Sequence, residues 1–256
     1  MTIETVLDGR GVLTLSLARP DVHNALNAAM MDAITDVAVR TRPGDARVIV
    51  LAGEGQSFCA GGDLGWMRHQ FEASDEGRRA EAQRLADMFH ALYMLDVPLI
   101  ARLHGNAFGG GVGLASLADV AIGVEGTLFG LTETRLGLIP ATIGPYVAAK
   151  MGPRLTEVFL SSRRFTAEEA VRLGLLARAV RAEDLDAAIQ AEIEPYLSCA
   201  PGAVADTKRL ARDLRPPIDA ALIARTMDAL IARWRSEEAA EGIGAFFEKR
   251  APHWAR

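Results

Sequence analysis

The sequence predicts an α/β fold with a helical C-terminal region. Up to residue 165, short apolar runs rich in β-branched residues alternate with stretches of helical periodicity, and from Thr166 onward the periodicity is mostly helical. A chain of 256 residues can bury one substantial core. We therefore expect a core domain over residues 1–195 and a helical region over residues 196–256.

The individual elements follow from local patterns. Residues 3–7 and 11–17 flank Asp8-Gly9-Arg10 and read as a hairpin. A helix is expected over residues 26–40, with Asn24 or Asn27 as its cap. Further strands are expected over residues 46–53, 97–105 and 119–124, where β-branched or apolar runs meet glycine or a charged residue. Further helices are expected over residues 76–95, 109–117, 166–174, 183–197, 201–212 and 218–249.

Composition excludes several classes of function. The formal net charge of −5 argues against a nucleic-acid or anionic-membrane partner. Two cysteines, Cys59 and Cys199, imply no disulfide framework and fit a reducing cytoplasm. The first residues lack the pattern of a signal peptide, and no apolar run is long enough to span a membrane. His69 and His104 stand alone without ligand spacing, so no metal site is expected.

Two glycine-rich loops follow strand patterns. "SFCAGGDL" comes after residues 46–53, and "GNAFGGGVGLASLAD" comes after residues 97–105. One N–H group from each loop converging on one oxygen would form an oxyanion hole. The alternative is that the glycines only permit tight turns and close packing. A dinucleotide fingerprint is excluded because Leu114 stands at its third glycine position.

A third stretch, "FGLTETRLGLIPATIGPY", carries Glu133 among apolar and small residues. A carboxyl group beside an apolar pocket has a raised pKa and becomes a proton carrier near neutral pH. The alternative is a solvated side chain that pairs with Arg135. The residues alone leave both readings open.

The three stretches, in this order, resemble the motifs of the crotonase superfamily, which includes enoyl-CoA hydratases and isomerases. The resemblance extends from "VLTLSLARPDVHNALN" to "AFFEKRAPHW". It implies a ββα spiral core with a helical C-terminal trimerisation region, assembled as a homotrimer or a dimer of trimers. It also implies an acyl-coenzyme A substrate and no cofactor beyond the coenzyme A that the substrate carries.

The resemblance also assigns roles to individual residues. The backbone N–H groups of Ala60 and Gly110 would hold the thioester oxygen, and Glu133 would move the proton. The stretch of Ala60, Gly61, Gly62 and Asp63 would line the pantetheine end of the substrate. Arg19, Phe246 and Lys249 would contact the nucleotide end. For Lys249, an ordinary exposed lysine is an equal alternative.

The sequence departs from the family at Gly113, where typical hydratases carry a second glutamate. Three functions then remain open. A hydratase would add water across a 2,3-enoyl-CoA, and the stretch "ETRLGLIPATIGPYV" resembles the methylglutaconyl-CoA and isohexenylglutaconyl-CoA hydratase branch. An isomerase would use Glu133 alone to move a double bond. A non-catalytic acyl-CoA-binding protein is disfavoured by the retention of Glu133 and both loops. Glu72, Asp75 and Glu76 are the most accessible candidates to replace the missing glutamate.

Overall fold

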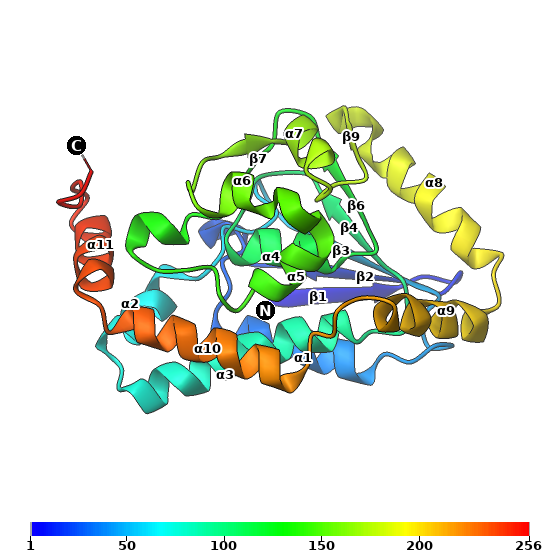
Figure 1. The fold of residues 1–256 in the computed structure, drawn as a ribbon. Helices are drawn as coiled ribbons and strands as arrows, with labels where there is room; N and C mark the ends of the chain where they lie inside the picture. Colours follow the sequence, from blue (N-terminus) through cyan, green and yellow to red (C-terminus); the bar gives the residue numbers. More distant parts are fainter. Residues whose placement is uncertain (1, 256) are drawn as a thin grey trace.

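A six-stranded sheet forms the centre of the protein, for which the computed structural model describes residues 2–255 (Figure 1). The strand order is β1-β2-β3-β4-β6-β9, and only the β1–β2 pair is antiparallel, which confirms the expected hairpin. The strands are β1 (Ile3–Leu7), β2 (Val12–Leu17), β3 (Val48–Gly53), β4 (Leu99–Leu103), β6 (Val120–Val124) and β9 (Arg178–Val180). The parallel arrangement places the ends of β3 and β4 at the same edge, where both glycine-rich loops begin.

Both faces of this sheet are covered. Along β3, Val48 and Val50 pack in a cluster with α8 (Leu185–Leu197). Ile49 and Leu51 instead belong to the main core cluster, with side chains of α1 (Ala28–Arg40), α3 (Asp75–Tyr93) and α4 (Gly110–Leu117). Since successive strand residues point to opposite faces, a strand buried on both sides reads as a continuous apolar run.

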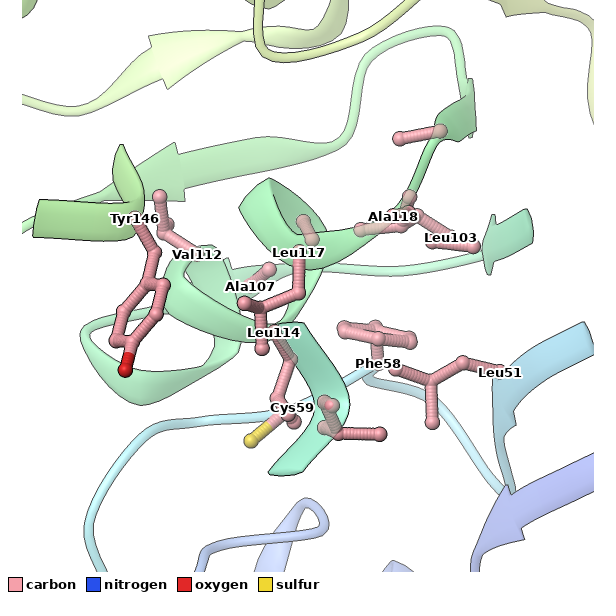
Figure 2. Packing of buried hydrophobic residues seen from close by; sticks show 14 of the residues in the cluster. Leu51, Phe58, Cys59, Leu103, Ala107, Val112, Leu114, Leu117, Ala118 and Tyr146 are labelled. Carbon is pink, nitrogen blue, oxygen red and sulfur yellow. The ribbon is translucent and has the colours of Figure 1, made fainter. Parts of the chain in front are cut away.

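Helix α4 lies inside the molecule rather than on its surface. Its residues from Gly111 to Leu117 are all buried. Figure 2 shows Leu114 and Leu117 of this helix gathered with Leu51 and Phe58. Burial on all sides explains why the helix is apolar around its whole circumference.

A small second sheet lies beside the first, in the order β5-β7-β8. Its strands are β5 (Ala107–Phe108), β7 (Leu128–Gly130) and β8 (Phe165–Thr166). The remaining helices are α5 (Gly144–Met151), α6 (Thr156–Phe159), α7 (Ala167–Arg172), α9 (Pro201–Asp213), α10 (Ala220–Trp234) and α11 (Glu237–Phe247), with a 3-10 turn η2 (Glu133–Leu136). The combination of an α/β core and a helical C-terminal region confirms the fold class.

Several details differ from the patterns in the sequence or decide between alternatives that it left open. The polar segment between the first glycine-rich loop and α3 contains a helix, α2 (Leu64–Glu72), which the Asp63 side chain caps. The run expected as one helix over residues 218–249 is divided into α10 and α11, because Ser236 caps a new helix. The boundary expected between residues 195 and 196 falls inside α8. At the first helix, Asn27 rather than Asn24 is the cap.

Candidate active site

The two glycine-rich loops lie against each other. Cys59 and Ala107 form a parallel bridge, and the Phe108 N–H donates to the Cys59 carbonyl oxygen at 3.0 Å. A methyl group on Gly61 would lie 2.9 Å from the Phe108 carbonyl oxygen, and Gly61 has φ +94°. A side chain there would both strain the backbone and push the loops apart, so glycine is required by geometry.

Gly62 and Gly110 are among the residues of these loops whose N–H groups have no hydrogen-bond acceptor within residues 2–255. Neither group has an acceptor among residues 2–255, and Gly110 is the first residue of α4, where no intrahelical acceptor exists. The position of a methyl group on Gly61 is 3.6 Å from the Gly110 nitrogen, so the first loop lies close to that donor. The site therefore offers one backbone donor from each loop.

Ala60 differs from the expectation that its N–H faces the substrate. Its N–H donates to the His23 carbonyl oxygen at 2.9 Å, because residues 23–26 run alongside the loop and take up its hydrogen bonds. The N–H group of Gly62, two residues further on, has no acceptor among residues 2–255. Residue type alone does not reveal this, since the direction of an N–H group depends on backbone dihedrals.

Glu133 lies at the start of η2, next to the second loop. Its Oε1 atom is 3.2 Å from the position that a Cβ atom on Gly109 would occupy. Its Oε2 atom is buried and has no hydrogen-bond partner among the described residues. Burial raises the pKa of Glu133 to about 7. The alternative of a carboxylate paired with Arg135 is not observed, since no salt bridge joins the two within residues 2–255.

A cavity of about 470 Å³ opens in front of these groups. Its walls come from both loops, α2, η2, the segment that follows η2, α10 and α11. Most of the lining is apolar, and the residues that line it include Leu26, Met31, Leu64, Trp66, Met67, Leu85, Leu136, Ile139, Ile143, Leu230 and Trp234. An apolar cavity with a few convergent polar groups is typical of a small-molecule site.

Polar lining is confined to few side chains. Besides Glu133, the cavity is lined by Thr132, Thr142, Arg135 and Arg164. The Arg164 guanidinium lies over the Phe108 ring, 5.3 Å from its centroid. Neither arginine forms an ion pair with another residue in the described part of the chain. Trp66 and Met67 could be assigned to an acyl pocket or to the core from the sequence, which favoured the core, and both line the cavity. No signal in the sequence separated Thr142 from core residues.

The position of the missing glutamate is packed rather than open. Gly113 is buried in α4, and a Cβ atom there would lie 2.7 Å from Ile143 Cγ2 and 2.8 Å from Phe89 Cε1. The space is therefore filled by two apolar side chains. The acids suggested as replacements, Glu72, Asp75 and Glu76, are exposed around the end of α2 and the start of α3 and do not line the cavity.

Arg19 and Asp63 contact each other instead of the cavity. Their side chains form a salt bridge at 2.9 Å, and Arg19 also donates to the Ala25 carbonyl oxygen at 2.6 Å. Burial alone would raise the pKa of Asp63, but hydrogen bonds from the Trp66 N–H and Arg19 bring it below its ordinary value. The pair ties the loop after β2 to the start of α2. This fixes the first glycine-rich loop in place, and neither residue lines the cavity.

Of the two C-terminal residues expected to contact the substrate, only Phe246 lines the cavity. Phe246 in α11 lines the cavity and is 45% exposed. Lys249 lies beyond α11, is exposed, and does not line the cavity. Among residues 2–255, no cluster of acids, histidines and cysteines has the arrangement of a metal site. Within the same residues no helix is both long and apolar enough to cross a membrane.

Comparison with known proteins agrees with this geometry. Residues 8–256 match a family described as "Enoyl-CoA hydratase/isomerase". A probable enoyl-CoA hydratase of Rhodobacter capsulatus is 36% identical over 253 residues, covering 95% of this chain and 94% of the relative. A carnitinyl-CoA dehydratase of Proteus mirabilis is 33% identical over 255 residues, with 95% and 94% coverage.

Solved structures give the same picture. An enoyl-CoA hydratase from Shewanella pealeana superposes with a TM-score of 0.78 and 36% identity, covering 99% of this chain and 96% of that one. Pseudomonas aeruginosa AtuE superposes with a TM-score of 0.81 and 33% identity over the full length of both chains. The similarity thus covers the core, both glycine-rich loops and the C-terminal helices.

Proposed function

The chain belongs to the enoyl-CoA hydratase/isomerase family, and from this premise we propose that it hydrates a 2,3-enoyl-CoA thioester with Glu133 as its single acid and base. One observation carries this proposal: the buried Glu133 carboxylate, with its pKa near 7, lies beside two loops that each offer a free backbone N–H. A group with that pKa accepts a proton and returns it at neutral pH.

The N–H groups of Gly62 and Gly110 hold the thioester oxygen. When water attacks Cβ, negative charge develops on this oxygen, and two preorganised donors stabilise the resulting enolate. Helix α4 begins at Gly110, so the positive end of its dipole faces the same charge. Loss of one such donor typically costs about 3 kcal/mol in the transition state.

Glu133 performs both proton transfers in sequence. It takes a proton from the attacking water as the C–O bond forms at Cβ, and it then gives that proton to Cα as the enolate collapses. The overall change adds one water molecule and is neutral in electrons, so the reaction needs no redox cofactor.

The substrate we propose carries a second carboxylate, as 3-methylglutaconyl-CoA does. Arg135 and Arg164 support this choice, because both line the cavity without an ion-pair partner among residues 2–255. A carboxylate at the far end of the acyl group would give one of them a charge-assisted hydrogen bond.

The same family membership supports a homotrimer or a dimer of trimers in the cytoplasm. Leu160 and Leu214 are 72% and 78% exposed, and contact between copies would cover them where they lie in the interface. Sedimentation analysis of the 27.4 kDa chain would distinguish one, three and six copies.

The test is to incubate the protein with 3-methylglutaconyl-CoA and, separately, with a 3-enoyl-CoA. Hydration gives a mass gain of one water and loss of the absorbance of the conjugated double bond. The second candidate is a Δ3–Δ2 enoyl-CoA isomerase, which is favoured by the absence of an acid at Gly113. It would move the double bond of the 3-enoyl-CoA at unchanged mass.

A further inference from the structure

Thr142 presents a buried hydroxyl group with no partner in the wall of the active-site cavity. Thr142 is 6% exposed, and its Oγ1 atom is buried and makes no hydrogen bond within residues 2–255. Thr142 lies on the segment between η2 and α5 and lines the same cavity as Glu133. A buried hydroxyl without a partner is costly, so its presence calls for a partner when the cavity is filled.

The location of Thr142 relates it to the missing glutamate. Its neighbour Ile143 supplies the atom closest to a Cβ on Gly113, at 2.7 Å. The segment of Thr142 and Ile143 therefore lies directly against position 113. Thr142 is the polar group that this segment contributes to the lining.

Thr142 and Glu133 line the same cavity, and each carries a buried polar atom without a hydrogen-bond partner among residues 2–255. The Oε2 atom of Glu133 is an acceptor when ionised. A threonine hydroxyl donates one hydrogen bond and accepts others. A water molecule that contacts both atoms would accept from the Thr142 hydroxyl and donate to Glu133 Oε2, and it would satisfy both groups.

We propose that Thr142 binds the nucleophilic water in place of the absent second acid, an inference that rests on the hydratase function proposed above. The hydroxyl orients a lone pair of the water toward Cβ of the substrate. The water oxygen bonds to Cβ, its proton passes to Glu133 Oε2, and Glu133 returns that proton to Cα. Thr142 exchanges no proton in net terms, so one carboxylate suffices for the chemistry.

The test compares Thr142→Val with Thr142→Ser. Valine keeps the shape and removes the hydroxyl, whereas serine keeps the hydroxyl and removes the methyl group. Hydration is measured with crotonyl-CoA and 3-methylglutaconyl-CoA. A second readout is the exchange of α-protons of butyryl-CoA with D2O, followed by NMR, which uses Glu133 and the oxyanion hole but adds no water to the substrate.

We expect Thr142→Val to lower kcat for hydration by about tenfold or more. We expect α-proton exchange to stay within about twofold of the parent protein, and Thr142→Ser to retain most hydration. Thermal unfolding should show no loss of stability in the valine variant, since it removes a buried unpartnered hydroxyl.

The outcomes separate the two proposals. Full hydration by Thr142→Val overturns the role of Thr142 and leaves the hydratase function standing. An equal loss of hydration and exchange, or a serine variant as slow as the valine variant, also overturns it, because the defect would then lie in Glu133 or in packing. If the parent protein exchanges α-protons but hydrates neither substrate, the hydratase function fails and the inference fails with it.

Discussion

Glu133 differs from Glu169 and Glu241 in having no cation at its side. Glu169 and Glu241 have pKa values lowered to about 2 by arginines that bind them. Glu133 is instead surrounded by apolar side chains and glycines, and burial raises its pKa to about 7. The same residue type therefore serves as a permanent anion at the surface and as a proton carrier in the cavity.

The pH dependence of the reaction follows from this pKa. Glu133 must be ionised to accept a proton from water, so kcat/KM should rise with pH and level off above about pH 7. Below that pH it should fall about tenfold per pH unit. Initial rates measured from about pH 5.5 to about pH 8.5 give the profile, because this range extends to both sides of the pKa of Glu133. A flat profile would mean that another group carries the proton.

The free energy of unfolding should depend on the same titration. The pKa of Glu133 is about 7 in the folded protein against 4.5 for a free side chain. Its contribution to stability is therefore fully present below pH 4.5 and is lost as pH rises through about 7. Glu133→Gln has no such titration, so its stability relative to the parent should increase between acidic and alkaline pH by about 3 kcal/mol.

Denaturant unfolding of both proteins at several pH values measures this difference, and the other titrating groups cancel between them. A constant difference across the range would show that Glu133 has an ordinary pKa.

The close packing around Gly113 predicts that a larger residue at this position lowers stability. Gly113→Ala would place a methyl group within 2.9 Å of the Phe89 ring and Ile143, so the variant should lose about 1–3 kcal/mol of stability. Gly202 in α9 is the matched control, because a Cβ there meets nothing within 4 Å. Gly202→Ala should be neutral or slightly stabilising. Equal melting temperatures for the two variants would show that the space beside Gly113 is open.

For individual residues, the sequence is most informative about which residue types could do chemistry. It is least informative about the directions in which their N–H groups and side chains point. Glu133 could be predicted as the proton carrier from its motif, since that role depends on the identity of the side chain. The choice of Gly62 over Ala60 depends on which N–H the His23 carbonyl occupies. Thr142 lies in an apolar stretch where a threonine is compatible with ordinary packing. Neither could be predicted without the backbone path.

Among the elements, α11 is packed directly on the turn that carries Glu133. A Cβ atom on Gly242 would lie 2.5 Å from the backbone carbon of Leu136, and one on Gly137 would lie 2.4 Å from the Glu238 carbonyl oxygen. The Arg233 side chain also donates to the Gly137 carbonyl oxygen at 2.6 Å. The C-terminal helices therefore support η2 through backbone contact, which only glycine permits.

This contact predicts opposite results for two glycines of one helix. Gly242→Ala should push α11 away from η2, and we expect a loss of about 1–3 kcal/mol of stability together with reduced kcat. Gly244→Ala should leave both unchanged or slightly improve stability, because nothing lies within 4 Å of its Cβ position. Thermal unfolding and steady-state kinetics measure the effects. Matching behaviour of the two variants would contradict a supporting role for α11.

Helices and strands with a clear period of apolar residues could be predicted from the sequence, whereas very short ones could not. The hairpin, α3 and β3 follow apolar patterns that extend over many residues. Strands β5 and β8 contain two residues each, which is too short for a period of two to be visible. Helix α2 mixes polar and apolar residues without a clear helical period. The only sequence feature that indicates its start is the capping residue Asp63.

On the scale of the whole molecule, the site is closed by segments far apart in the sequence. The core sheet supplies the two loops, η2 supplies the carboxylate, and α10 and α11 supply part of the cavity wall. Figure 1 shows α10 lying alongside α3, and Ala82, Ala86 and Met227 form a shared cluster there. The helical region expected over residues 196–256 is therefore part of the active site as well as a cover for the core.

Hydration of a thioester by a single carboxylate distinguishes the proposed reaction from that of a hydratase with two acids. The most direct measurement is the mass of the product formed from 3-methylglutaconyl-CoA in water labelled with heavy oxygen, by the parent protein and by Glu133→Gln. We expect a product heavier by one labelled water from the parent protein and no product from the variant. A product of unchanged mass, or equal labelling by the variant, would contradict it.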